Sequence, residues 1–502
     1  MSIAKKIISQ SGIYFAGTLF SVGIGLFFKI YISKKLGADM LGVYALGMTI
    51  VTVLSVFLSL GLGNGLVRFV SKYLAQHNFT QLHTYLRKTF GITLIMSIIS
   101  ASVFFLFPDF ISIKLLNSPE LTPYLSYFGI LLIINAIITL CDQTIRGFQE
   151  VRKSTIIGHF IRLPLKIAAA VGFITMGYQL KGYIWAEIIG AIVALALFMV
   201  LIKKLLPKQM SKLTLKATSK ITKEERTFGN NMLLINTIGL LQAEGDKILL
   251  VIYLSTTDLG VYSIALTLTA FVPTVLVSVN AIFTPIISQL HTENRILELK
   301  KYYQVSCKYI FVLTFPLIVF LIVFNQPILD VFGEEFKVGG QVLILLLIGQ
   351  IINTSTGSVG MMLNMTGLEH VGRNSAIFTS ILSLIGYLIL IPKYGLIGIG
   401  IVKLFAMSFQ GIYAVYMLYT KQQIHAFSAS YIKIILIFIL SSLAYYTYLR
   451  VGILDDFTQP LWLFIGLCFT YLIFVILFLA FSTQEDKQFI KSLINKSKKG
   501  IS

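Results

Sequence analysis

The chain has 502 residues, of which 56% are hydrophobic and only 12% charged, and its mean hydropathy is +0.84. A soluble domain carries about twice that charged fraction, so the composition excludes a soluble globular protein. The formal net charge of +20 could indicate binding to nucleic acid. Whether it does depends on where the charged residues lie along the chain.

Hydropathy predicts an all-α integral membrane protein with about fourteen spanning helices, each close to the length of about 20 residues that crosses a bilayer. The expected spans are 11–33, 43–67, 89–108, 124–145, 155–176, 182–202, 230–254, 260–287, 309–326, 341–364, 374–392, 396–419, 431–449 and 460–481. The first of them lacks the small-residue cleavage site of a signal peptide, so we expect it to stay in the protein.

The charges sort the loops between these spans into two sets. With the N-terminus placed in the cytoplasm, the cytoplasmic loops hold most of the 41 Lys and Arg residues, whereas the outer loops hold few. Such an excess of Lys and Arg on one side sets the orientation of membrane proteins. The net charge therefore indicates topology, with both termini cytoplasmic, and no nucleic-acid partner is expected.

The two halves of the chain resemble each other. Residues 29–44 align without gaps with residues 247–262, and both segments end in Leu-Gly-Val-Tyr. Two further anchors follow in the same order at nearly the same offset: Gly147–Val151 with Gly367–Val371, and Tyr178–Gly182 with Tyr394–Gly398. Six expected spans separate the members of each pair, so the repeats share one orientation, an architecture known from transporters.

This duplication predicts the domain organisation. We expect an N-terminal six-helix lobe at 1–202 and a C-terminal six-helix lobe at 228–420, joined by a basic cytoplasmic linker at 203–227. Residues 421–502 are expected to form two further helices and a basic cytoplasmic tail. Substrate sites in such proteins lie between the repeats, and access alternates when one repeat rocks against the other.

Several short motifs carry a family resemblance over nearly the whole chain. Besides Leu-Gly-Val-Tyr after the first and seventh spans, the loop Arg146–Ser154 and the segment Gly245–Val251 have the family pattern. The chain resembles the Wzx-type polysaccharide flippases (O-antigen and exopolysaccharide) of the multidrug/oligosaccharidyl-lipid/polysaccharide exporter superfamily. That superfamily also holds the peptidoglycan-precursor flippases and the MATE drug exporters, so the resemblance implies a MATE-like fold.

Charged residues inside the expected spans are the candidate site, because a charge in hydrocarbon by default marks a functional cavity. Arg162 and Lys166 lie four residues apart on one helical face, with Pro164 between them. They repel each other unless an anion or a partner acid lies nearby. A pyrophosphate that links lipid to sugar is such an anion.

Three further lysines are candidates for binding an anionic headgroup. Lys29 and Lys247 occupy equivalent repeat positions, which favours one on each wall of a central cavity, and Glu244 is close enough in sequence to neutralise Lys247. The resemblance to peptidoglycan-precursor flippases, which carry basic residues in the first span, adds Lys35. An alternative places Lys35 in an outer loop.

Lys403 matches Glu187 at the repeat offset. The two are expected to form an ion pair, and Lys403 is retained as a candidate headgroup contact. Glu187 and Glu244 are the candidate residues for ion coupling. Asp142 and Arg146, at i and i+4, are interpreted as a local pair outside the site.

The resemblance implies a flippase that moves undecaprenyl-pyrophosphate-linked oligosaccharide from the cytoplasmic to the outer leaflet of a bacterial plasma (inner) membrane. Two alternatives stay open within the fold: a flippase for a peptidoglycan precursor or other cell-wall glycolipid, and a cation-coupled MATE drug exporter. The excess of basic over acidic residues in the spans favours an anionic cargo. A glycan-assembly enzyme is disfavoured, because the chain has no D-x-D motif and no long outer loop.

We therefore expect a transporter and not an enzyme, without a cofactor or bound metal, since no metal-ligand or nucleotide-binding motif occurs. The expected partners are the lipid-linked oligosaccharide and membrane lipids. H⁺ and Na⁺ are candidate coupling ions, and polysaccharide polymerase machinery is a candidate protein partner.

Overall fold

The computed structural model describes residues 3–207, 221–450 and 460–481, and the regular structure of these residues is helical throughout. In chain order the helices are α1 (Ile3–Leu58), α2 (Leu62–Ala75), α3 (Phe79–Leu106), α4 (Leu125–Gly147), α5 (Val151–Thr155), α6 (Leu163–Thr175), α7 (Gln179–Leu205), α8 (Lys223–Tyr253), α9 (Thr256–Thr269), α10 (Phe271–Thr292), α11 (Ile296–Val323), α12 (Asn325–Asp330), α13 (Gly340–Thr356), α14 (Val359–Met365), α15 (Glu369–Gln422), α16 (Ala429–Arg450) and α17 (Pro460–Phe481). A π-helical turn, Ile156–Arg162, joins α5 to α6.

Every expected span falls on one or two of these helices. Nine helical segments among the described residues are long and apolar enough to cross a membrane by length and composition, so the chain is a multi-pass membrane protein. The count of fourteen spans stays a prediction. The helix α8, at the seventh expected span, is not among the nine, and it carries Glu244, Asp246 and Lys247 in its C-terminal half.

Two of the long helices each cover more than one expected span: α15 contains two, and α1 contains the first and most of the second. The helix α1 is interrupted at Gly37, where φ is 76° and ψ is 175°, and α15 is interrupted at Gly395, where φ is 57° and ψ is −134°. A positive φ is accessible to glycine at little cost. Each glycine therefore divides its helix at the boundary between the two expected spans.

By its packing contacts the chain divides into two compact units. The first comprises Met1–Ser263 with Leu384–Leu396, and the second comprises Ile264–Ser383 with Ile397–Ser502. These units follow contacts and not the sequence repeat, so the two expected six-helix lobes remain a prediction.

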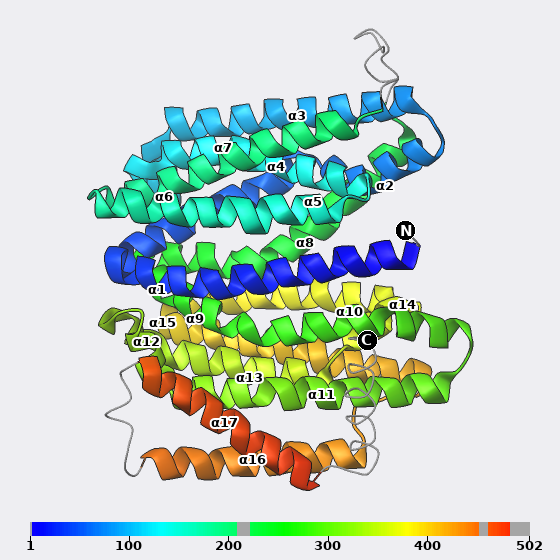
Figure 1. The fold of residues 1–502 in the computed structure, drawn as a ribbon. Helices are drawn as coiled ribbons and strands as arrows, with labels where there is room; N and C mark the ends of the chain where they lie inside the picture. Colours follow the sequence, from blue (N-terminus) through cyan, green and yellow to red (C-terminus); the bar gives the residue numbers. More distant parts are fainter. Residues whose placement is uncertain (1–2, 208–220, 451–459, 482–502) are drawn as a thin grey trace. The chain divides into compact units, whose positions relative to one another are not determined.

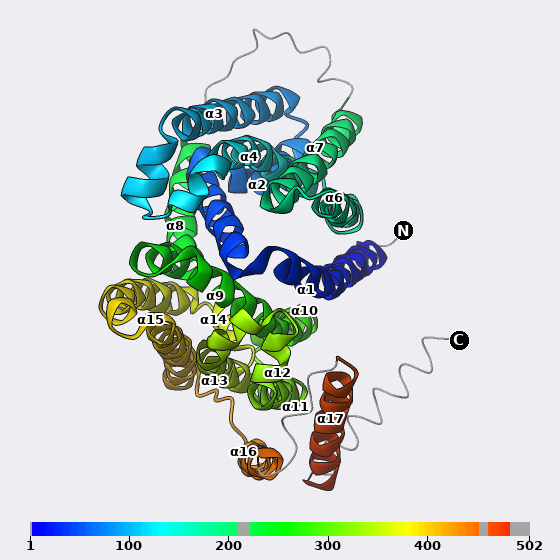
Figure 2. The same ribbon diagram turned by 90° about the vertical axis from the view of Figure 1, so that its left-hand side faces the viewer.

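Within the first unit, α4 lies at the centre and packs against α1, α2, α3 and α7 (Figures 1 and 2). In the second unit, α11 has the corresponding place and packs against α10, α13, α16 and α17. Its aromatic residues Phe311 and Phe315 contact Phe438 of α16, and Phe315 also contacts Phe474 of α17.

The helix α3 shows how a membrane protein distributes its residues. Leu94, Ile95 and Ile99 are exposed, whereas Thr89, Thr93 and Ser97 on the opposite side are at most 1% exposed. Apolar side chains facing outward and polar ones facing inward suit a helix surrounded by lipid. The inward side of α3 is therefore polar between Thr89 and Ser97, and Thr93 in this stretch lies in the region of the candidate site.

Candidate functional site

A carboxylate on α7, Glu187, is the centre of the site. Its side chain is buried and accepts a hydrogen bond from the hydroxyl of Tyr44 on α1, with 2.8 Å between Tyr44 Oη and Glu187 Oε2. Arg162 Nη2 lies 3.1 Å from Glu187 Oε1, and Lys166 Nζ pairs with Glu187 Oε2. Glu187 is thus the partner acid that the spacing of Arg162 and Lys166 requires.

The local structure brings the two cations to this acid. Arg162 is the last residue of the π-helical turn and Lys166 lies in the first turns of α6. Pro164 is tolerated at the start of α6, because the first turn of an α-helix leaves its N–H groups without intrahelical partners. Single π-helical turns occur often at functional sites, and this one ends at a site residue.

Two stacked tyrosines hold the ammonium group of Lys166. Tyr44 and Tyr183 stack with their ring centroids 4.2 Å apart, and Lys166 Nζ lies 5.6 Å and 5.1 Å from the two centroids. Lys166 Nζ also donates to Tyr44 Oη over 3.3 Å. Cation–π contacts of this kind stabilise a poorly hydrated cation, so Lys166 is fixed by several partners.

Lys247 on α8 is neutralised by its own helix. Its Nζ lies 2.8 Å from Glu244 Oε2, and the same carboxylate oxygen accepts a hydrogen bond of 3.1 Å from Thr49 of α1. The pairing of Lys247 with Glu244 that the sequence suggested is present in the structure.

Lys29 on α1 is the exception among these cations. It is partly buried and lies within electrostatic range of Lys166 and Lys247, yet no described residue offers it a carboxylate or a hydrogen bond. Lys29, Arg162, Lys166 and Lys247 outnumber the acids beside them, which are Glu187, Glu244 and the buried Asp246 next to Lys247, so positive charge is in excess here. We call Lys29, Arg162, Lys166, Lys247, Glu187 and Glu244 the charge cluster.

The remaining candidates lie outside the charge cluster. Lys35, near the break in α1, is exposed, and no described residue pairs with it. Lys403 is partly buried on α15 in the second unit. Glu187, expected to pair with Lys403, is held within its own unit by Arg162 and Lys166. Asp142 and Arg146 form the expected local pair, with 2.8 Å between Arg146 Nε and Asp142 Oδ2.

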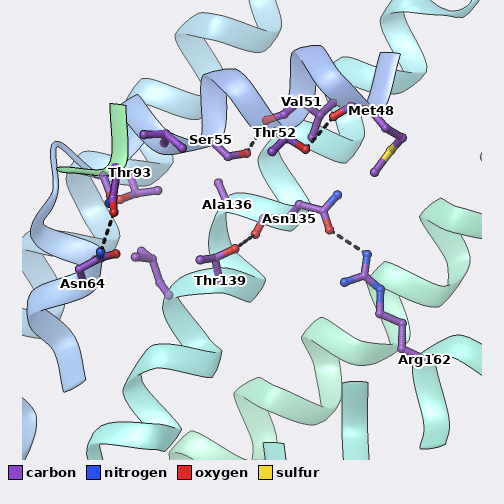
Figure 3. Close-up of a pocket in the computed structure, with 15 residues that line it drawn as sticks. Met48, Val51, Thr52, Ser55, Asn64, Thr93, Asn135, Ala136, Thr139 and Arg162 are labelled. Atoms are coloured by element: carbon purple, nitrogen blue, oxygen red, sulfur yellow. Dashed lines mark hydrogen bonds between the residues drawn. The ribbon is translucent and has the colours of Figure 1, made fainter. Parts of the chain in front are cut away.

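A cavity of about 440 Å³ adjoins the charge cluster in the first unit. Figure 3 shows Arg162 at one side of it, donating to Asn135 of α4 over 2.8 Å between Nη2 and Oδ1. The other lining residues are neutral: Met48, Val51, Thr52, Ser55, Val56, Ser59, Gly63, Asn64, Thr93, Asn135, Ala136, Thr139, Leu140 and Asn236. Arg162 therefore belongs to the charge cluster and to the cavity wall.

The sequence reasoning missed several residues of this region. Tyr44 ends the repeated Leu-Gly-Val-Tyr motif, and this repetition could have identified it as a candidate site residue. Asn135 and Thr93 gave no signal, because uncharged polar residues are common in membrane spans. Asp246, inside the seventh expected span, received no role from the sequence; it is fully buried and accepts a hydrogen bond of 2.5 Å from Tyr262.

The structure is similar to solved transporter structures along most of the chain. An inward-facing MATE multidrug-resistance transporter of the MOP superfamily matches with a TM-score of 0.66 and 15% identity, covering 81% of this chain and 94% of that one. The lipid II flippase MurJ in an inward closed conformation matches with a TM-score of 0.66 and 15% identity, covering 93% and 98%. The fold is therefore that of MOP-superfamily transporters.

Sequence comparison identifies the family. The model of the family described as polysaccharide biosynthesis protein matches residues 35–338, and the chain belongs to this family. A curated relative, the probable low-salt glycan biosynthesis flippase Agl15 of Haloferax volcanii, is 21% identical over 399 residues, which is 79% of each chain.

Proposed function

We propose that the protein is a flippase that moves undecaprenyl-pyrophosphate-linked oligosaccharide from the cytoplasmic to the outer leaflet of a bacterial plasma membrane by alternating access. The family supports a role in polysaccharide biosynthesis, and the relative from Haloferax volcanii is itself named a glycan biosynthesis flippase. The asymmetry of Lys and Arg supports cytoplasmic termini.

The observation that carries the proposal is the uncompensated charge of Lys29. A lysine inside a membrane is costly unless an anion or a water-filled cavity accompanies it. Arg162, Lys166 and Lys247 have acidic partners, whereas the ammonium of Lys29 has none among the described residues. A pyrophosphate diester, which bears one negative charge on each of its two phosphate groups, would neutralise Lys29 and the excess charge around it.

The same features disfavour a cationic drug as cargo. The described residues that line the cavity include no acid, and both acids of the charge cluster are already paired. A cation entering this region would meet repulsion from Lys29 without a free carboxylate to offset it. A peptidoglycan precursor has the same anionic linkage, so the identity of the saccharide needs a direct measurement.

The test is mass spectrometry of lipid-linked saccharides in the source organism, with the gene deleted and then restored. Deletion should cause a complete, unpolymerised lipid-linked unit to accumulate, and restoring the wild-type gene should remove it. The Lys29→Gln protein should fail to remove it, whereas Lys34→Gln, which changes an exposed lysine on the same helix, should succeed. If no lipid-linked saccharide accumulates, the proposal is wrong; the mass of an accumulated unit would identify the sugar.

A further inference from the structure

The cavity beside Arg162 is lined by groups that recognise hydroxyls and amides. Its neutral polar residues are five with hydroxyl side chains (Thr52, Ser55, Ser59, Thr93 and Thr139) and three with amide side chains (Asn64, Asn135 and Asn236). Its volume of about 440 Å³ is within the range of small-molecule sites, about 300–1,000 Å³. None of the described lining residues is aromatic or acidic. Such a surface suits a neutral ligand rich in hydroxyl groups.

One of these groups is buried without a partner. Thr93 is 1% exposed, and its hydroxyl has no hydrogen-bond partner among the described residues. A buried hydroxyl that makes no hydrogen bond costs about 1–3 kcal/mol in proteins. Because Thr93 lines the cavity (Figure 3), a ligand there would supply the missing bond.

The amides leave further donors available. The carbonyl of Asn135 accepts from Arg162, and no described residue accepts from its NH₂ group. Asn64 donates to the carbonyl of Asn236 over 3.2 Å, which leaves the NH₂ group of Asn236 without a described acceptor. Three polar groups on α3, α4 and α8 therefore have unused hydrogen-bonding capacity in one cavity.

Arg162 connects this cavity with the charge cluster, where the pyrophosphate is proposed to bind. Among the described residues that line the cavity, Arg162 is the one that is charged, and it also pairs with Glu187 in the charge cluster. A ligand with a phosphate at the charge cluster would place the group next to that phosphate at Arg162 and Asn135. In a lipid-linked saccharide the pyrophosphate carries the lipid chain at one end and the first sugar at the other, and the polar lining of the cavity suits the sugar.

We propose that this cavity is a saccharide subsite, which binds the hydroxyl and acetamido groups of the phosphate-linked sugar through Thr93, Asn135 and Asn236. The inference rests on the proposed flippase function and deepens it. In this proposal Thr93 contacts the sugar, whereas Lys29 acts on the phosphate.

The chain offers a matched pair of variants for the test. Thr93→Val replaces the unpartnered hydroxyl with a methyl group of the same shape. Thr89→Val makes the same change one turn earlier on α3, at a threonine that is equally buried and that does not line the cavity. Both substitutions remove one hydroxyl, so a purely structural effect should be similar in the two proteins.

Binding of two probes, N-acetylglucosamine 1-phosphate and inorganic phosphate, is measured on the purified full-length protein in detergent. The wild type should bind the sugar phosphate more tightly than phosphate. Thr93→Val should weaken sugar phosphate binding about fivefold, the value of one hydrogen bond, and leave phosphate binding unchanged. Thr89→Val should leave both unchanged.

Each other outcome overturns the inference in a distinguishable way. If Thr93→Val and Thr89→Val behave alike, or if the wild type binds both probes equally, the cavity is not a saccharide subsite, while the anion site survives. If neither probe binds, or if phosphate binds equally well to wild type and Lys29→Gln, the proposed anion site is wrong and the subsite fails with it.

Discussion

Gly42 of α1 and Gly260 of α9, equivalent positions of the two repeats, lie where the two helices meet backbone to backbone. A Cβ atom on Gly42 would lie 1.7 Å from the carbonyl oxygen of Thr256, and one on Gly260 would lie 1.9 Å from that of Ala38. Ala38 and Thr256 are themselves equivalent repeat positions, so the two contacts are reciprocal. Such reciprocity is characteristic of a twofold relation between matching surfaces.

The tyrosines that end the two motifs follow the same relation. Tyr44 donates a hydrogen bond to Glu187, and Tyr262 donates one to Asp246. Both carboxylates are buried. Leu-Gly-Val-Tyr therefore combines a glycine that permits close helix contact with a tyrosine that satisfies a buried acid.

The glycine contact leads to a first prediction. Gly42→Ala should lower the stability of the protein by about 1–3 kcal/mol, the usual cost of overpacking, because the backbone of Thr256 cannot yield as a flexible side chain would. Thermal unfolding of the purified protein in detergent measures this. Gly25→Ala on the same helix, where a Cβ would meet nothing within 4 Å, should change stability little. Equal effects of the two variants would contradict the proposed contact.

A second prediction concerns Glu187, which neutralises Arg162 and Lys166. Glu187→Gln should destabilise the protein by about 3–5 kcal/mol, because removing one partner leaves buried charges uncompensated. The double variant Glu187→Gln with Lys166→Met should recover part of that loss. Glu150→Gln breaks the more exposed pair with Lys153 and serves as the control in thermal unfolding. A Glu187→Gln protein as stable as the control would show that the charges do not depend on this acid.

A third prediction concerns the contact between α2 and the start of α8. Glu224 pairs with Lys72 and with Arg68, at 2.9 Å between Arg68 Nη2 and Glu224 Oε1. The hydrogen bond from Lys72, followed by the charges of Lys72 and Arg68, lowers the pKa of Glu224 below its ordinary value of 4.5. The carboxylate therefore stabilises the folded protein above pH 4.5, and this contribution is lost as the pH falls through the lowered pKa.

The measurement is the difference in unfolding temperature between wild type and Glu224→Gln as a function of pH. The difference should be present at neutral pH and should vanish in acid, and it should shrink at high salt because Glu224 is exposed. Glu298→Gln, which breaks a local pair with Arg295, controls for general effects of an added neutral side chain. A difference that persists unchanged in acid would mean that ionisation of Glu224 does not support this contact.

The sequence predicted the helices well because hydropathy and helix length are local properties. The break of α1 at Gly37 differs in form from the expected loop between 33 and 43: the chain there stays helical on both sides of a single glycine. In the same way, the expected span 260–287 is two helices, α9 and α10, that meet at Ala270.

The candidate site was predictable only in part. Charges in apolar segments identified Lys29, Arg162, Lys166 and Lys247, because each is costly in a membrane wherever it lies. Their partners depend on contacts between distant segments, so the pairing of Glu187 with Arg162 and Lys166 was not predicted. Thr93 and Asn135 acquire their significance from the cavity, which no sequence pattern describes.

The central claim is tested most directly by transbilayer movement in proteoliposomes that contain the purified protein and a labelled undecaprenyl-pyrophosphate-linked saccharide. The fraction of label accessible from one side is followed in time. The wild-type protein should equilibrate the label faster than protein-free liposomes, Lys34→Gln should match it, and Lys29→Gln should be slow. Equal rates with and without the protein would contradict the flippase assignment, and full activity of Lys29→Gln would contradict the role of Lys29 in binding the anion.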